Sequence, residues 1–332
     1  MILVPINTLF ASEKGIVWKV NLNGTEQFIS IQTAIDHIPN SNHSFITIQI
    51  SAGVYAEKLL IKKSNFELVG AGINKTIITQ SIARDEWRCE HGDDWGVATV
   101  NVDSASSINF RDLTIENVYG FNQLETKTIN CPLDTNKIKI VQSTGHQMAF
   151  RSFYATKLKF INCYFRSKGG DTMSPWNTTD GMFYLYNCVL EGGVDFYCPR
   201  GWAYAENCQF YSHNGPAAIW HDGSLHEDAK SVLVNCTFNG FDQFQLGRFH
   251  RDAQFYIINC HFAENMANQN IYQVKTNNTL SWPGRVYYYN CDKPGTTNNF
   301  FKNSIDQAID LPEALHFNAN WVFKNRWNAV EQ

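Results

Sequence analysis

The stretch Asn187-Cys188-Val189-Leu190-Glu191-Gly192-Gly193-Val194-Asp195-Phe196 opens with the phrase that decides the fold. This Asn-Cys phrase returns at intervals through the second half of the chain. Its other copies are Asn162-Cys163-Tyr164-Phe165, Asn207-Cys208-Gln209-Phe210, Asn235-Cys236-Thr237-Phe238, Asn259-Cys260-His261-Phe262 and Asn290-Cys291.

The spacing of these phrases indicates a coil made of strands. The cysteines at positions 163, 188, 208, 236, 260 and 291 are separated by 25, 20, 28, 24 and 31 residues. A period of about 20–30 residues, built from short strands without intervening helices, is typical of a β-solenoid. We therefore expect an all-β chain whose coils stack in parallel, with asparagines and aromatics forming ladders at equal registers.

The region before the repeat predicts one helix followed by short strands. Ser30 is a suitable N-cap, apolar residues then recur at helical spacing, and Pro39 ends the segment. This helix would cover the open end of the coil. From Phe45 the period changes to two, and short strands are expected around residues 46–50, 53–57, 59–61, 66–70, 76–79, 97–102 and 113–117. Residues 1–25 give no clear signal.

The chain is expected to form a single domain over residues 1–332. The repeat core runs from about residue 45 to 291, and residues 292–332 form a tail. In this tail, residues 305–315 predict a short helix, and residues 321–327 would pack back on the coils. The longest stretch that leaves the coil is 119–144, since insertions in solenoids map to loops.

Composition excludes several classes of protein. Hydrophobic residues make up 44% and charged residues 17%, which indicates a globular chain. A net charge of -4 and no basic run give no case for a nucleic-acid partner. No run of about 18 apolar residues predicts a membrane span, and Met1-Ile2-Leu3-Val4-Pro5 is too short for an intact secretory signal.

The cysteines are expected to be mostly free thiols. There are nine of them, and no CxxC pair suggests a zinc or redox site. In the Asn-Cys ladder, stacked Cβ atoms would be separated by about 4.8 Å, the strand spacing. A disulfide needs about 3.8 Å, so the ladder cysteines should act as small buried hydrophobes.

Two aspartates fall at nearly the same register of the repeat. Asp171 lies eight residues after Cys163, and Asp195 lies seven after Cys188. Their backbones should then be about 5 Å apart on consecutive coils. Two such carboxylates do not easily both ionise, so one pKa should rise, which suits a nucleophile paired with a general acid/base. The alternative is that both are turn aspartates on a solvated corner.

Five motifs, in the right order, resemble those of the pectin methylesterases over roughly residues 28–327. Together they are specific, although each alone is weak. They are Gly53-Val54-Tyr55-Ala56-Glu57 for GxYxE, Gly145-His146-Gln147-Met148-Ala149-Phe150 for GQAVAL, Gly170-Asp171-Thr172-Met173 for QDTL, Gly192-Gly193-Val194-Asp195-Phe196 for GxVDF, and Leu246-Gly247-Arg248-Phe249-His250 for LGRPW.

The resemblance implies a right-handed, single-stranded parallel β-helix and an esterase mechanism. Asp195 would attack the carbonyl of a galacturonate methyl ester. Asp171 would protonate the departing methanol and then activate water. Arg248 would orient Asp195 and keep it ionised, and Gln147 would donate to the oxyanion. This chemistry requires no metal and no cofactor.

The chain departs from the family at the edges of this site. Gly170 replaces the glutamine of QDTL, which removes an oxyanion donor. His250 replaces the tryptophan of LGRPW, and Cys198 replaces an aromatic after VDF. The residues expected to contact the sugar are Trp176, Trp220, His250, His146 and Phe196.

The implied substrate is methyl-esterified pectin, and the implied protein is an extracytoplasmic monomer. A lyase or polygalacturonase is a second interpretation, although the sequence has no acid cluster of the kind that binds calcium. A non-catalytic polysaccharide-binding β-helix is a third. Gly92-Asp93-Asp94-Trp95 and His221-Asp222-Gly223 are interpreted as loop or cleft-wall segments.

A chelator gives the first test. We expect EDTA to leave any release of methanol from pectin unchanged, because the implied chemistry uses carboxylates and water alone. A loss of methanol release that added Ca²⁺ restores would contradict this expectation.

Overall fold

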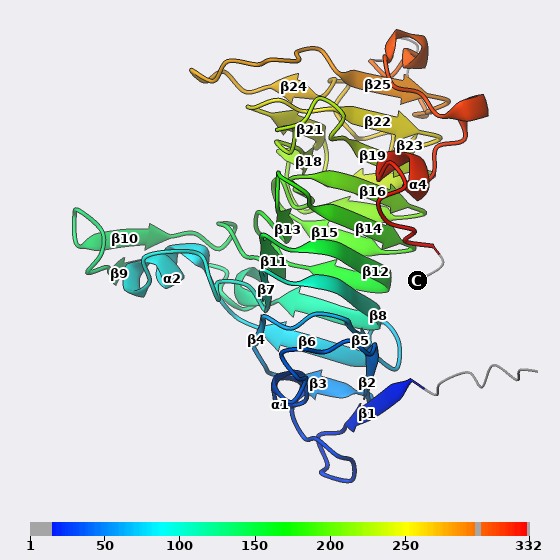
Figure 1. Cartoon of the computed structure of the whole chain (residues 1–332). Helices are drawn as coiled ribbons and strands as arrows, with labels where there is room; N and C mark the ends of the chain where they lie inside the picture. Colours follow the sequence, from blue (N-terminus) through cyan, green and yellow to red (C-terminus); the bar gives the residue numbers. More distant parts are fainter. Residues whose placement is uncertain (1–14, 296–299, 331–332) are drawn as a thin grey trace, which may run out of the picture.

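The computed structural model describes residues 15–295 and 300–330, and the chain coils into a parallel β-helix (Figure 1). Each coil contributes strands to three faces, and corresponding strands on consecutive coils pair in parallel. The predicted fold class is therefore confirmed. The segment Met1–Pro5, considered above as a signal, lies outside the described residues.

The first face is a sheet of parallel strands that runs along the whole coil, from the N-terminal to the C-terminal end. Two of its strands, β8 and β12, are long and continue onto the second face. In order, the strands are β1 (Ile16–Val20), β2 (Ile46–Ile50), β5 (Phe66–Val69), β8 (Ser106–Asn117), β12 (Thr156–Arg166), β14 (Met182–Tyr186), β16 (Trp202–Glu206), β19 (Ser231–Val234), β22 (Phe255–Ile258) and β25 (Val286–Tyr289).

The second face contains the later halves of β8 and β12. Its other strands are β3 (Gly53–Tyr55), β6 (Thr76–Gln80), β15 (Val189–Gly192), β17 (Gln209–Ser212), β20 (Thr237–Gly240) and β23 (His261–Phe262).

The third face is formed by two runs of parallel strands joined by isolated bridges such as Met173 to Tyr197 and Tyr197 to Ile219. The first run contains β4 (Leu59–Ile61), β7 (Val100–Asp103), β11 (Phe150–Phe153) and β13 (Met173–Trp176). The second contains β18 (Ala217–Trp220), β21 (Gln245–Phe249) and β24 (Tyr272–Gln273).

The Asn-Cys phrase makes the corner between the first and second faces. Its six asparagines have positive φ, from 50 to 54°. Asparagine tolerates this left-handed conformation better than most residues do. The side chains also form a ladder: Asn187 donates to Asn162 at 2.7 Å, and Asn290 donates to Asn259 at 3.0 Å. The asparagine therefore both bends the chain and binds neighbouring coils.

The residues after each asparagine fill the interior. Five ladder cysteines, from Cys163 to Cys260, are fully buried, and all of the ladder thiols are free, as predicted. Two residues later come stacked aromatics, such as Phe210 and Phe238, whose ring centroids are 4.6 Å apart. Period-two alternation thus sends cysteine and phenylalanine inward together.

The predicted N-terminal helix is present as α1 (Ile31–Asp36). Ser30 caps it by accepting from the amide of Thr33 at 3.2 Å. Glu57, from the GxYxE motif, accepts from the amides of Ile31 and Gln32 at 3.0 Å each. A carboxylate at a helix N-terminus satisfies free N–H groups and complements the helix dipole. The strand β1 before this helix was not predicted.

The C-terminal tail packs on the first face, as expected. Phe317, Val322 and Trp327 are buried among the aromatic side chains of that face. The single helix predicted over residues 305–315 is wrong. The segment instead forms two 3₁₀ turns, Ile305–Gln307 and Glu313–Leu315, because Pro312 lies between them, and a short helix, α4 (Ala319–Val322), follows.

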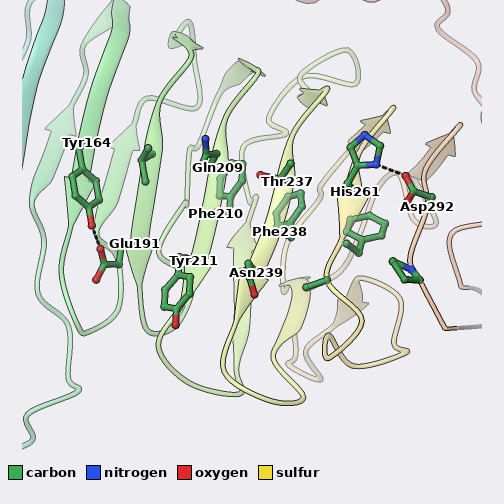
Figure 2. A pocket seen from close by; sticks show the side chains of 14 residues that line it. Tyr164, Glu191, Gln209, Phe210, Tyr211, Thr237, Phe238, Asn239, His261 and Asp292 are labelled. Atoms are coloured by element: carbon green, nitrogen blue, oxygen red, sulfur yellow. Dashed lines mark hydrogen bonds and ion pairs between the residues drawn. The ribbon is translucent and has the colours of Figure 1, made fainter. Parts of the chain in front are cut away.

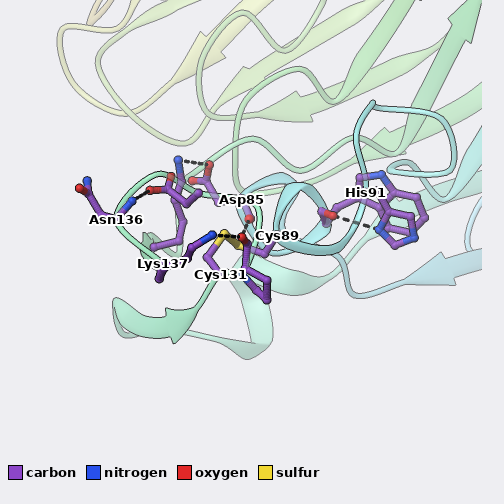
Figure 3. Close-up of a disulfide and its surroundings, with 10 residues drawn as sticks. Asp85, Cys89, His91, Cys131, Asn136 and Lys137 are labelled. Carbon is purple, nitrogen blue, oxygen red and sulfur yellow. Dashed lines mark hydrogen bonds and ion pairs between the residues drawn. A yellow bond between two sulfur atoms is a disulfide. The ribbon is translucent and has the colours of Figure 1, made fainter.

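The stretch 119–144 leaves the coil, as predicted, and projects beside α2 (Arg84–Glu90) (Figure 1). It contains the short helix α3 (Tyr119–Asn122) and an antiparallel hairpin of β9 (Lys127–Asn130) and β10 (Ile138–Val141). A disulfide between Cys89 and Cys131 joins the hairpin to α2 (Figure 3). No pattern in the sequence indicated this pairing.

Among the described residues, no helix is both long enough and apolar enough to cross a membrane.

The asparagine corner can be tested at Asn187. Asn187→Ala should destabilise the protein more than Asn187→Gly, because both lose the ladder hydrogen bond but only alanine is strained at φ 53°. The difference in unfolding free energy should be about 1 kcal/mol, measured by urea denaturation. Equal stability of the two variants would contradict a need for the left-handed conformation.

Candidate active site

Asp171 and Asp195 lie side by side at the turn from the second face to the third. The amide of Asp171 donates to the carbonyl of Val194 at 3.2 Å, so the two aspartates occupy neighbouring positions on consecutive coils. The register argument for their proximity is therefore confirmed. Both have positive φ, 58° and 47°, a conformation uncommon for residues other than glycine. We call these two residues the acid pair.

Arg248 holds Asp195 through two nitrogens. It reaches back from β21, where its Nη2 is 2.8 Å from Asp195 Oδ2 and its Nε is 3.1 Å from Oδ1. This planar, two-point contact fixes the orientation of the carboxylate. The Asp195 side chain is only 12% exposed. Arg248 thus supplies a charged partner for a nearly buried acid.

Burial dominates the ionisation of Asp195. It raises the pKa of the Asp195 carboxyl to about 6, although the hydrogen bonds and charge of Arg248 oppose this rise. The nearby charge of Asp171 adds to the rise. Burial disfavours a charged carboxylate, and an adjacent cation favours it. Asp195 therefore loses its proton as the pH rises through about 6.

At Asp171, in contrast to Asp195, nearby positive charges have a larger effect on the pKa than burial has. Burial pushes its pKa upward, but the charges of His146, Arg200 and Arg151 outweigh that effect and leave the pKa below the usual range. Arg151 Nη1 lies 3.4 Å from Asp171 Oδ2, and His146 Nε2 lies 3.9 Å from Oδ1. The acid of the pair with the raised pKa is therefore Asp195, and Asp171 is the more readily ionised.

Two arginines that the sequence did not point to surround this site. Arg151 on β11 is buried, and it donates to Ser174 Oγ at 2.7 Å and lies 3.7 Å from Asp94. Arg200 lies two coils after Arg151, opposite Trp176, and its guanidinium is 4.6 Å from the Trp176 ring. An arginine on a strand carries no local sign of its role, because its partners come from other coils.

The tryptophans and histidines expected at the sugar surface lie on the third face and beside it. Trp176 is 41% exposed, whereas Trp220 is largely buried and lies 5.7 Å from the Arg248 guanidinium. His250 packs edge-on against Trp220 and pairs with Asp222 at 2.6 Å. The side chain of His146 is half exposed beside the acid pair.

The side chains of two predicted site residues are buried and do not lie on the surface beside the acid pair. Gln147 is fully buried, and its amide accepts from the Gly120 amide at 2.9 Å and donates to the Ser143 carbonyl at 2.6 Å. It therefore anchors the 119–144 insertion instead of facing an oxyanion. Phe196 is also fully buried in the core. Because its side chain is buried among core residues, Phe196 cannot contact a sugar.

Hollows lie on both sides of the coil. One of about 590 Å³ lies over the second face, where Tyr164 points to Glu191 and His261 points to Asp292 (Figure 2). It contains none of the predicted site residues. Another, of about 300 Å³, is lined by Arg151 and by the surface that we call the shelf: Asp93, Trp95, Phe153, Tyr154 and Trp176. Because Arg151 also touches Asp171, the shelf adjoins the acid pair.

Two segments that the sequence analysis interpreted as loop or cleft-wall segments, residues 92–95 and 221–223, have structural roles. Asp94 pairs with Arg84 at 3.0 Å and is close to Arg151, and Asp222 accepts from the amides of His250 and Arg251. Among residues 15–295 and 300–330, no group of three His, Cys, Asp or Glu side chains is arranged to hold a metal ion.

The fold and this site define the chain as a parallel β-helix protein in which one turn brings together two aspartates and an arginine. The sequence model described as "Pectinesterase" matches residues 18–168. Pectinesterase QRT1 of Arabidopsis thaliana is 26% identical over 69% of this chain, and putative pectinesterase 11 of the same plant is 26% identical over 94% of this chain and 81% of its own length. The chain is therefore similar in sequence to pectinesterases, most clearly over residues 18–168.

Solved structures support the same fold. Pectin methylesterase PemA from Erwinia chrysanthemi superposes with a TM-score of 0.71 at 19% identity, covering 95% of this chain and 98% of that one. The carrot enzyme superposes with a TM-score of 0.64 at 17% identity, covering 89% and 88%. The chain spans 57%, 64% and 63% of the length of the first three Arabidopsis relatives. The family match ends just before Asp171, so the acid pair stands on its own geometry.

The opposing effects of burial and Arg248 on the pKa of Asp195 can be measured directly. Arg248→Gln removes the cation that favours the ionised carboxylate, so the pKa of Asp195 should rise by about 1 unit or more. Titration of the Asp195 carboxyl carbon by NMR would measure this shift. Arg251→Gln, a change at an exposed neighbour, is the matched control and should leave the titration in place. An unchanged Asp195 titration in Arg248→Gln would show that burial alone sets its pKa.

Proposed function

We propose that this chain hydrolyses the methyl esters of galacturonate units in pectin and releases methanol. The observation that carries this proposal is the clamp of Arg248 on Asp195, one coil from Asp171. A structural turn aspartate needs no buried two-point arginine, and a surface that only binds polysaccharide needs no acid pair. Sequence similarity to pectinesterases supports the same reaction.

In the first half of the reaction, Asp195 acts as the nucleophile. One carboxylate oxygen attacks the ester carbonyl, the bond from that carbonyl to the methoxy oxygen breaks, and a mixed anhydride forms between the galacturonate and Asp195. Arg248 holds the attacking carboxylate in one orientation. Because only the ionised carboxylate attacks, this step requires a pH above about 6, the pKa of Asp195. The methoxide must also gain a proton in order to leave as methanol.

In the second half, water attacks the carbonyl of the anhydride. Asp171 lies next to the nucleophile and accepts the proton of that water. The bond to Asp195 then breaks, which frees the galacturonate and restores the Asp195 carboxylate. The ionised state favoured for Asp171 suits this role as a base. No step requires a metal or a cofactor.

The third face provides the surface for the polysaccharide. Trp176 is an exposed member of the shelf, and its ring can stack on a sugar face. Tyr154, 75% exposed, extends this aromatic surface. A pectin methylesterase of the same fold has been solved in complex with a hexasaccharide. We therefore infer a pectic chain as the partner.

The remaining features of the proposal follow from the substrate. Pectin lies in the plant cell wall, so the protein would act outside the cytoplasm. Asp171, Asp195 and Arg248 all come from one chain, so a monomer suffices for the reaction.

The nucleophile can be tested with Asp195→Asn, which keeps the shape of the side chain. Release of methanol from highly methyl-esterified pectin should fall by about 10³-fold or more, as expected for loss of a nucleophile. Asp306→Asn, a change of the same kind in the C-terminal tail, should retain the wild-type rate. Coupled oxidation of the methanol would report both rates.

Two outcomes would contradict this assignment. If wild type releases no methanol from pectin or from pectic fragments yet binds them, the protein is a polysaccharide-binding β-helix. If Asp195→Asn keeps the wild-type rate, the nucleophile is another residue even though the reaction stands.

A further inference from the structure

His146 lies directly beside the acid pair on the preceding coil. It forms an isolated parallel bridge with Gly170, the residue before Asp171. Its Nε2 atom is 3.9 Å from Asp171 Oδ1, and its charge also acts on Asp195. Three consecutive coils therefore bring an imidazole and two carboxylates together at one turn. The imidazole side chain is 49% exposed, so a substrate can reach it.

Gly170 and His146 are complementary in space. A Cβ added at Gly170 would lie 3.2 Å from His146 Cδ2 and 3.0 Å from both the carbonyl oxygen and a methyl carbon of Val194. Both separations are tight for non-bonded atoms, so a Cβ at position 170 would require Val194 and the imidazole to shift by a few tenths of an ångström. Gly170 thus leaves room for His146 to pack beside Asp171.

The charged groups around Asp171 favour the ionised form of its carboxyl group. Arg151 contacts its carboxylate, and Arg200 and His146 add positive charge, so the net effect lowers its pKa despite burial. A carboxylate surrounded by cations is a poor source of the proton that methoxide needs. The half-exposed imidazole of His146, 3.9 Å from Asp171 Oδ1, is the neighbouring group from which such a proton can come. Methoxide is a strong base, and its departure depends on such a proton.

We propose that His146 is the catalytic acid that protonates the departing methanol, with Asp171 as its ion-pair partner. This inference rests on the proposed esterase function and assigns one of its steps. The imidazolium gives its proton to the methoxy oxygen as the bond between that oxygen and the carbonyl carbon breaks, and the products are methanol, the Asp195 anhydride and a neutral imidazole.

The second half of the reaction restores the starting state. Asp171 and the neutral imidazole together accept one proton from the attacking water, and the hydroxide adds to the galacturonate carbonyl and expels Asp195. Overall, one ester and one water give one galacturonate, one methanol and one released proton. No oxidant, reductant or other reactant is needed.

The test uses two esters that differ only in the leaving group. Methyl and trifluoroethyl esters of oligogalacturonate would be compared for wild type, His146→Gln and His146→Ala. Trifluoroethoxide is a weaker base than methoxide, so its departure depends much less on protonation. His146→Gln should lower kcat for the methyl ester by about 10²-fold or more, the usual contribution of a general acid. For the trifluoroethyl ester the loss should be less than about tenfold, and KM should be nearly unchanged.

The glutamine variant separates the two chemical roles open to His146. Glutamine can donate a hydrogen bond to an oxyanion but cannot give up a proton. If His146→Gln keeps the wild-type rate on the methyl ester while His146→Ala loses it, His146 is an oxyanion donor and the proposal is wrong. Equal losses on both esters would also overturn it, because they indicate positioning or structural damage.

Failure of the underlying function would look different. If wild type cleaves neither ester, the proposed esterase function fails, and this inference fails with it. If Asp195→Asn abolishes cleavage of both esters while His146→Gln loses only the methyl ester, the nucleophile and the acid are separated and both assignments stand. Thermal unfolding of each variant, compared with wild type, would confirm that the half-exposed position tolerates the change.

Discussion

Parallel hydrogen bonding between consecutive coils is the constraint on which the rest of the structure depends. It fixes each residue opposite one particular residue of the next coil, for example Asp171 opposite Val194. The left-handed asparagines keep this register, because they turn every coil at the same position and bind one another. A one-residue slip would exchange inward cysteines and phenylalanines for outward polar residues, so burial of the core protects the register. The geometry of the acid pair follows from this regularity.

The same register concentrates charge at one turn. Asp171 and Asp195 would repel each other if both were ionised without partners, and each is instead matched to its own cations. Arg248 comes from a later coil and contacts Asp195, whereas Arg151 comes from the preceding coil and contacts Asp171. The two acids differ because Asp195 is dominated by burial and Asp171 by surrounding positive charge. Separation of two carboxylates by environment is a common basis for assigning different roles to them.

Much of the fold could be predicted because its signals are local and periodic. The asparagine corners, the free cysteine ladder, the capping helix near Ser30 and the departure of residues 119–144 all follow from spacing and residue type. Less regular features could not be predicted. The Cys89–Cys131 disulfide joins an insertion to α2, and nothing in the sequence specifies how these two segments dock. The tail over residues 305–315 contains Pro312, which divided an apparent helix into two turns.

The sequence by itself determined the β-helix and the proximity of Asp171 to Asp195, because a repeat converts sequence spacing into spatial register. Tertiary structure alone decided which side chains enter the site. Gln147 turned inward to bind the insertion, and Phe196 became core. Arg151, Arg200 and His146 gathered around Asp171 and reversed the expected order of ionisation. The physical reason is that burial and electrostatic environment depend on atoms supplied by other coils, and no local pattern encodes those neighbours.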